Sequence, residues 1–379
     1  MPHFPVRSGA FKECQLCGQR SLEISAKIGV CKTCILTNFE KANAIISRVR
    51  IKERQKYSLP PTIPKTTKGV VCGDCVNACK IAEGEFGYCK LVTNVAGQLV
   101  RLAGDENRGL FSFYYDPLPT NCVAEPFCAG CTSNDFPTFS YSRGPEIGWN
   151  NLAVFYQACT YDCLFCQNYQ YREGVTAATS FPPKVLVNAL KTNTSCICFF
   201  GGDPAAQIRH SIAVANLARE KAQKQKRILR ICWETNGSAR PALMRECAQI
   251  ALHSGGVIKI DIKAFSDKLN IALCGSSNRF SLYNLKVIGK QVQKRPDLPL
   301  LVVSTLLIPG YIDVEEVRKL AQFIVGIDPT IPFSLLAFYP TFIMNDLPTT
   351  SKKLAFDCLA AAKEEGLSNV HIGNIHLLH

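Results

Sequence analysis

Cys159, Cys163 and Cys166 form a C-x3-C-x2-C pattern directly after the apolar run 152–156. Three thiolates at this spacing can bind three corners of a cubic [4Fe–4S] cluster. No fourth cysteine lies near them in the sequence, so the remaining iron would stay open to an exogenous ligand, as in a catalytic metal site. The pattern therefore predicts a redox-active cluster. The alternatives are a zinc knuckle or inert thiols.

A second cysteine pattern lies near the N-terminus, where Cys14, Cys17, Cys31 and Cys34 follow C-x2-C-x13-C-x2-C. Two such pairs joined by a short hairpin bring four thiolates into a tetrahedron, as in a zinc ribbon. So short a segment has too little core to fold alone, so the metal would supply its stability. We predict a structural zinc site.

Cys72, Cys75, Cys79 and Cys89 form a third set within eighteen residues. Four ligands can saturate a metal, so this site is expected to be closed. Zinc, a single iron and an Fe–S cluster all remain open as its occupant, because thiolates bind all three.

Cys122, Cys128 and Cys131 form a further group that has no obvious fourth ligand. They are either an accessory site or packed free cysteines.

Two short polar segments after apolar runs could bind a cofactor. Gly201 and Gly202 would let the backbone approach a ligand closely, and Asp203 could accept hydrogen bonds from an ammonium group. Asp261 and Lys263 point to the same face of an expected strand, because side chains alternate with period two. A turn at 201–204 and a buried ion pair without a catalytic role are the alternatives.

From residue 150 onward, short apolar runs alternate with amphipathic stretches. The expected strands are 152–156, 196–200, 229–233, 257–262, 300–306 and 332–337. The expected helices are 184–191, 205–223, 241–252, 281–292, 314–325 and 351–365. Six such units predict an α/β fold, a partial or complete parallel (β/α)6 barrel with catalytic groups at the carboxyl ends of the strands.

Small Cys-rich metal-binding modules are expected before the barrel. The predicted organisation is a zinc-ribbon-like module over 1–40, a basic helix and Pro-rich linker over 41–66, a Cys-rich accessory region over 67–148, and the barrel over 149–379.

Composition supports a globular protein inside the cell: 47% of its 379 residues are hydrophobic and 19% are charged. The N-terminus has no apolar signal segment, and no run reaches the roughly 18 apolar residues of a membrane span. We therefore expect a cytoplasmic protein with no membrane partner, and we interpret most of its twenty cysteines as metal ligands rather than disulfides. An open Fe–S cluster implies a reducing, anaerobic cell.

The formal net charge is +13. Part of the excess lies in the runs 48–56 and 219–227, which we interpret as solvated helix faces. Docking of an acidic protein or of nucleic acid is the alternative. Because no aromatic-interleaved basic motif is present, nucleic acid is disfavoured as a partner.

The cysteine loop, with Phe165 just before its last cysteine, resembles the signature of the radical S-adenosylmethionine (radical SAM) superfamily. Gly201-Gly-Asp-Pro204 resembles the Gly-Gly-Glu-Pro motif of that superfamily, which holds the methionine amino group; Asp203 replaces the glutamate. The resemblance implies a [4Fe–4S] cluster and S-adenosylmethionine as cofactors, bound near Phe165, Gly201, Gly202 and Asp203.

The segments Thr235-Asn-Gly237 and Asp261-Ile-Lys263 look like those that line the S-adenosylmethionine pocket of glycyl-radical-enzyme activases. On that basis Asn236, Asp261 and Lys263 are assigned to cofactor binding. Over residues 70–379 the chain also resembles the AMMECR1-linked radical SAM proteins, from which the zinc-ribbon-like segment is a departure.

The resemblance implies reductive cleavage of S-adenosylmethionine and hydrogen abstraction from a protein or peptide, with ferredoxin or flavodoxin as electron donor. It identifies no catalytic side chain. The radical formed on the substrate would either remain there or be methylated, as it is by the cobalamin-dependent radical SAM enzymes that modify methyl-coenzyme M reductase. The sequence shows no cobalamin-binding signature. A non-catalytic Fe–S and zinc scaffold, or a nucleic-acid-binding protein, would explain the cysteines but not Gly201–Asp203 or Asp261 and Lys263.

Overall fold

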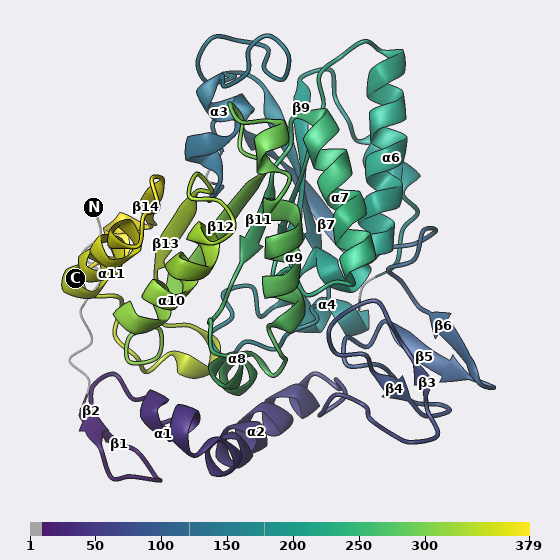
Figure 1. Cartoon of the computed structure of the whole chain (residues 1–379). Coiled ribbons are helices and arrows are strands. Elements are labelled where there is room, and N and C mark those ends of the chain that lie inside the picture. The colour runs from purple at the N-terminus through teal and green to yellow at the C-terminus, as the bar shows by residue number, and fades with distance from the viewer. Residues whose placement is uncertain (1–9, 121, 178) are drawn as a thin grey trace.

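A mostly parallel, eight-stranded sheet forms the centre of the computed structural model, which describes residues 10–120, 122–177 and 179–379. Its strand order is β14-β13-β12-β11-β10-β9-β8-β7 (Figure 1). The strands from β8 to β14 run parallel, and β7 pairs antiparallel with β8. Their bounds are β7 Phe111–Pro117, β8 Asn150–Tyr156, β9 Thr194–Gly201, β10 Arg230–Thr235, β11 Ile258–Asp261, β12 Leu301–Leu307, β13 Phe333–Ala337 and β14 Val370–Gly373.

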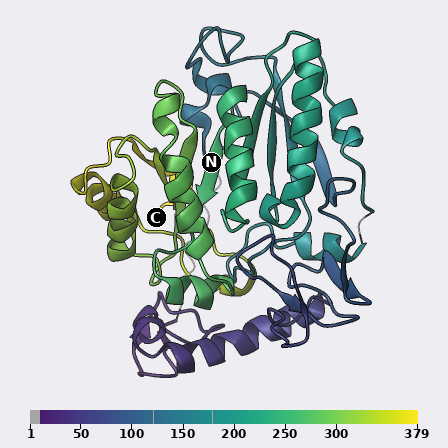
Figure 2. The same ribbon diagram turned by 45° about the vertical axis from the view of Figure 1, so that its right-hand side comes forward.

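Helices connect the parallel strands and pack beside one another along the sheet, α6 against α7, α7 against α9 and α10 against α11 (Figure 2). Within the described ranges, no helix is both long and apolar enough to cross a membrane. The helices are α4 Tyr171–Ala177, α5 Lys184–Asn188, α6 Ile208–Lys224, α7 Pro241–Ser254, α8 Asp267–Cys274, α9 Arg279–Gly289, α10 Val314–Val325 and α11 Lys352–Glu364.

This architecture confirms the predicted α/β fold and all six expected strands. The sheet is an open, partial barrel, since no pairing joins β14 to β7 within the part of the chain that the structure describes. Periodicity did not indicate β14, a four-residue strand in which only Val370 is buried. It also missed β7 and α8. The helix α8 begins at Ser266, whose side chain accepts from the Leu269 amide, and ends at Gly275 with φ +74°.

Small elements precede and accompany the sheet. Figure 1 shows α1 and α2 lying along the α8 end of the sheet, where the amide of Ser25 donates to the Tyr311 hydroxyl, which in turn donates to the Val30 carbonyl. One continuous hydrophobic core includes residues of both parts. These elements are β1 Lys12–Glu13, β2 Arg20–Ser21, α1 Lys32–Thr37, α2 Phe39–Lys56, β3 Val70–Val71, β4 Lys80–Ile81, β5 Val92–Val95, β6 Gln98–Arg101 and α3 Ala129–Thr132.

The basic run 48–56 is not simply the solvated helix face that the sequence suggested. Within α2, Arg50 and Arg54 are buried, and both reach the carboxylate of Asp162, which lies between the cysteines of the loop after β8. The nitrogen–oxygen distances to Asp162 are 2.6 Å from Arg172, 3.4 Å from Arg54 and 3.8 Å from Arg50. A carboxylate that is 1% exposed needs such partners to stay ionised, which explains why these cations are buried.

We predict that Asp162→Asn lowers the free energy of unfolding by about 3–5 kcal/mol, because it leaves three guanidinium groups without their shared counter-charge. The measurement is the midpoint of urea unfolding. Asp357→Asn is the matched control, since the pair Lys353–Asp357 on α11 is largely exposed and should contribute less than about 1 kcal/mol. Equal shifts in the two variants would show that the buried network adds no stability.

Candidate functional site

The three-cysteine loop follows β8 and is held in place by its own backbone. The amide of Asp162 donates to the Cys274 carbonyl at 2.8 Å, and the amide of Leu164 donates to the Leu273 carbonyl at 3.0 Å. These bonds fix the loop to the end of α8, so Cys159, Cys163 and Cys166 need little reorganisation to act together.

A cavity lies at the carboxyl ends of the strands, and all three cysteines line it. The structure brings together there every residue predicted to bind the cofactor. These are Phe165, Gly201, Gly202, Asp203, Asn236, Asp261 and Lys263. That each of them contacts a cofactor stays a prediction.

Cys274 is a fourth thiol that the sequence gave no reason to place here. It lies beside Cys163, and a hydrogen bond between the two thiols lowers the pKa of Cys163. Cys274 is fully buried behind the loop and does not line the cavity. The fold thus brings a fourth thiol close to the loop, but among the described cysteines only the three predicted ones line the cavity.

Gly201 and Gly202 have a packing role that the sequence did not suggest. Gly201 has φ +112°, and a Cβ there would lie 2.6 Å from the Tyr156 amide nitrogen. A Cβ at Gly202 would lie 2.3 Å from the Ala158 carbonyl oxygen. The two glycines thus let the end of β9 pack directly against the start of the cysteine loop.

The carboxylate of Asp203 is buried and already accepts three hydrogen bonds. The donors are the Ala205 amide at 2.7 Å, the Thr235 hydroxyl at 2.7 Å and the Asn236 amide at 2.6 Å. Burial raises the pKa of Asp203 to about 6, although these bonds act in the opposite direction. A carboxylate offers about four lone-pair positions, so one remains for a donor in the cavity.

Asn236 positions the cysteine loop. Its amide nitrogen donates to the Thr160 hydroxyl at 2.9 Å and lies 3.8 Å from the sulfur of Cys159. Its amide oxygen accepts from the Ser238 amide. Because these contacts use both ends of the side chain, Asn236 holds Cys159 in place whether or not it also touches a ligand.

Two ion pairs form the floor of the cavity. Lys263 pairs with Asp261, and Lys259 pairs with Glu234 at 3.1 Å. Burial opposes charge on Asp261, but the charges of Lys263 and Lys259, the hydrogen bond from Lys263 and the nearby Ser304 hydroxyl together outweigh it and lower the pKa of Asp261. Oδ1 of Asp261 is buried and has no hydrogen-bond partner in the described ranges, so it can accept from a bound hydroxyl or ammonium group.

Sequence reasoning missed Glu234 and Lys259, although a signal for each was available. The period-two alternation that placed Asp261 and Lys263 on one face also places Lys259 there. Glu234 lies opposite Lys259 in the register of β10 with β11.

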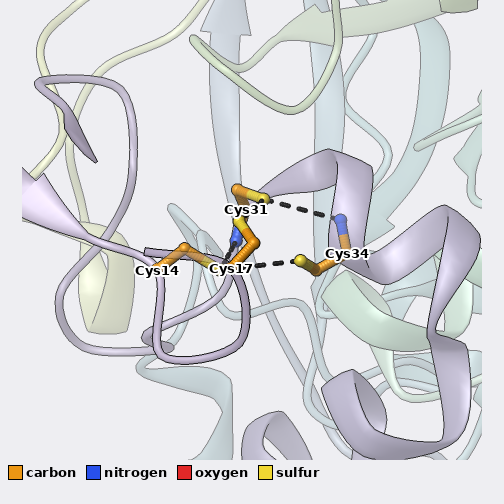
Figure 3. A group of neighbouring side chains, drawn as sticks. All are labelled: Cys14, Cys17, Cys31 and Cys34. Atoms are coloured by element: carbon orange, nitrogen blue, oxygen red, sulfur yellow. Dashed lines mark hydrogen bonds between the residues drawn. The ribbon is translucent and has the colours of Figure 1, made fainter. Parts of the chain in front are cut away.

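The four N-terminal thiols converge as predicted (Figure 3). All their sulfurs lie within 4.8 Å of one another, with Cys14–Cys34 and Cys17–Cys31 both at 3.7 Å. A tetrahedral ion with sulfur ligands at about 2.3 Å would separate the sulfurs by about 3.8 Å. The geometry therefore suits a single tetrahedral ion, and zinc remains our proposal for it.

Cys72, Cys79 and Cys89 belong to one small hydrophobic cluster. Burial, together with the nearby thiols of Cys89 and Cys79, raises the pKa of Cys75. Zinc, a single iron and an Fe–S cluster all suit these thiolates, so the occupant of this set stays a prediction.

Comparisons with known proteins agree with this geometry. Residues 153–324 match the family model of the radical SAM superfamily. This part of the chain is therefore a radical SAM domain, preceded by the N-terminal cysteine cluster. Uncharacterized protein MJ0808 of Methanocaldococcus jannaschii is 22% identical over 315 residues, which cover 81% of each chain.

Solved structures give weaker likenesses. A domain of pyruvate-formate lyase-activating enzyme from Bacteroides vulgatus is 19% identical with a TM-score of 0.37, over 47% of this chain and 98% of that one. Streptococcus suis SuiB bound to its precursor peptide SuiA is 17% identical with a TM-score of 0.42, over 58% and 47%. These scores are too low to bear on the substrate.

We predict that Cys31→Ala/Cys34→Ala removes about one zinc ion per chain, because two thiolates cannot complete the tetrahedron. Metal content of the purified protein, measured by mass spectrometry, tests this. Cys247→Ala, at a buried cysteine of α7 outside the thiol sets, should keep its zinc. Undiminished zinc in the double variant would mean that the metal is bound elsewhere.

Proposed function

We propose that the protein is a radical SAM enzyme that modifies or activates a protein or peptide. The observation that carries the proposal is the single cavity in which three thiols meet Gly201–Asp203 and the Asp261–Lys263 pair. The donor set suits a [4Fe–4S] cluster with one open iron. Bound there by the three thiolates, the cluster would supply the electron for reductive cleavage of S-adenosylmethionine, which is the source of a hydrogen-abstracting deoxyadenosyl group.

The residues of the chain would bind and orient the cofactor. The free lone pair of Asp203 and the unpartnered Oδ1 of Asp261 can accept from its ammonium and hydroxyl groups. Phe165 is buried at the cavity wall and helps to exclude water, which would otherwise compete with the bound groups.

The substrate class rests on the sequence resemblance to activases, which act on protein backbones. A ferredoxin or flavodoxin as electron donor, and an anaerobic cytoplasm, belong to the same proposal. No feature of the described residues favours cobalamin-dependent methylation over hydrogen abstraction alone.

We expect Cys159→Ala/Cys163→Ala/Cys166→Ala to abolish 5′-deoxyadenosine formation while the N-terminal zinc remains, because among the described cysteines only these three line the cavity. The assay uses protein reconstituted anaerobically with iron and sulfide, reduced in the presence of S-adenosylmethionine. Cys358→Ala is the control, since that buried thiol lies in α11. Cleavage by the triple variant at the wild-type rate would sink the proposal.

We further expect the affinity for S-adenosylmethionine to fall as pH drops through about 6, where Asp203 takes up a proton and loses its charge. Asp203→Asn should bind about ten- to a hundredfold more weakly at pH 8 and show no step near pH 6, since one charge-assisted bond contributes about 1.5–3 kcal/mol. Equilibrium dialysis of reconstituted protein from pH 5 to 8, with the cluster absorbance as integrity check, measures both. A step of equal size in Asp203→Asn would exclude Asp203 as its origin.

A further inference from the structure

A second, smaller cavity lies inside the partial barrel toward the amino ends of β9, β10 and β11. Five cysteines line it, and we call it the thiol chamber. Two come from the segment 122–131, two from β9 and one from β10: Cys122, Cys128, Cys196, Cys198 and Cys232.

Strand geometry explains why these thiols meet. Cys196 and Cys198 are two residues apart on β9 and so point to one face, and Cys232 is opposite Cys198 in the register of β10 with β9. The segment that carries Cys122 and Cys128 covers this end, packing with Phe127 against β11 and β12. Figure 1 shows its helix α3 at the end of the sheet opposite α8. This arrangement supplies the further ligands that Cys122, Cys128 and Cys131 lacked in the sequence.

The chamber thiols contact one another and a carboxylate. Cys196 and Cys232 share a hydrogen bond, as do Cys128 and Cys131. The thiol of Cys122 donates to Glu234 at 2.8 Å. None of the cysteines forms a disulfide, so all are available as ligands. Inert packed cysteines do not need to gather around one shared cavity from three separate segments of the chain.

The donors of the chamber indicate the kind of centre. Among the described residues, five thiols and no histidine line it. Thiolates are the ligands of Fe–S clusters, and they also bind zinc, which the metal analysis below distinguishes. We propose that four of the five chamber cysteines bind a second Fe–S cluster, separated from the S-adenosylmethionine cavity by Glu234 and Lys259, which line both.

The test compares iron and sulfide content in full-length protein reconstituted anaerobically with ferrous iron and sulfide. Cys196→Ala/Cys198→Ala/Cys232→Ala should lose about two to four irons and as many sulfides per chain, the content of one [2Fe–2S] or [4Fe–4S] cluster. Its remaining cluster should still change its electron paramagnetic resonance signal when S-adenosylmethionine is added. Cys247→Ala/Cys358→Ala, two buried thiols outside the chamber, should keep all iron and sulfide.

Because the strand variant could misfold, Cys122→Ala/Cys128→Ala provides a second measurement in the covering segment and should lose the same iron. The chamber cluster should also persist in Cys159→Ala/Cys163→Ala/Cys166→Ala. A result against the proposed function would therefore differ from a result against the chamber cluster. Unchanged iron in both chamber variants overturns the proposal. Loss of zinc in place of iron, or a Cys196–Cys232 disulfide in the anaerobic protein, overturns it as well.

Discussion

The arrangement of the cofactor cavity depends on one buried carboxylate, Asp162. It lies within the cysteine loop, between Cys159 and Cys163, and three guanidinium groups from two other elements surround it. This charge can hold the loop in place because the arginines of α2 and α4 reach it from outside the sheet. The helix α2 therefore supports the cysteine loop from behind through these ion pairs, although no residue of α2 lines the cavity itself.

Much of the site could be predicted because its determinants are local. The cysteine spacing, the apolar run before it and the rule that parallel strands end at one edge together place Cys159, Asp203 and Asp261 around the same space. Each of these inferences uses only a few neighbouring residues. The residue pattern of a strand and of the loop after it is therefore enough to predict these positions without knowledge of the tertiary structure.

The residues that were missed depend on partners far away in the chain. Arg50 is buried because of Asp162, 112 positions later, and nothing near Arg50 indicates this. Cys274 reaches Cys163 only because α8, an element that periodicity did not indicate, ends beside the loop. Nothing in the sequence around Cys196 or Cys232 indicates a site, because only the register of β9 with β10 brings their thiols together. Tertiary pairing, not local pattern, makes these contacts.

The contact between Gly202 and Ala158 has an evolutionary consequence. With its Cβ position 2.3 Å from the Ala158 carbonyl oxygen, any side chain at residue 202 would push the backbone that carries Cys159. The ends of β8 and β9 therefore cannot vary independently: a lineage that lost this glycine would have to reshape the start of the cysteine loop in the same step. We therefore expect substitutions at residue 202 and at the start of the cysteine loop to be correlated among related sequences, rather than either place to be conserved alone.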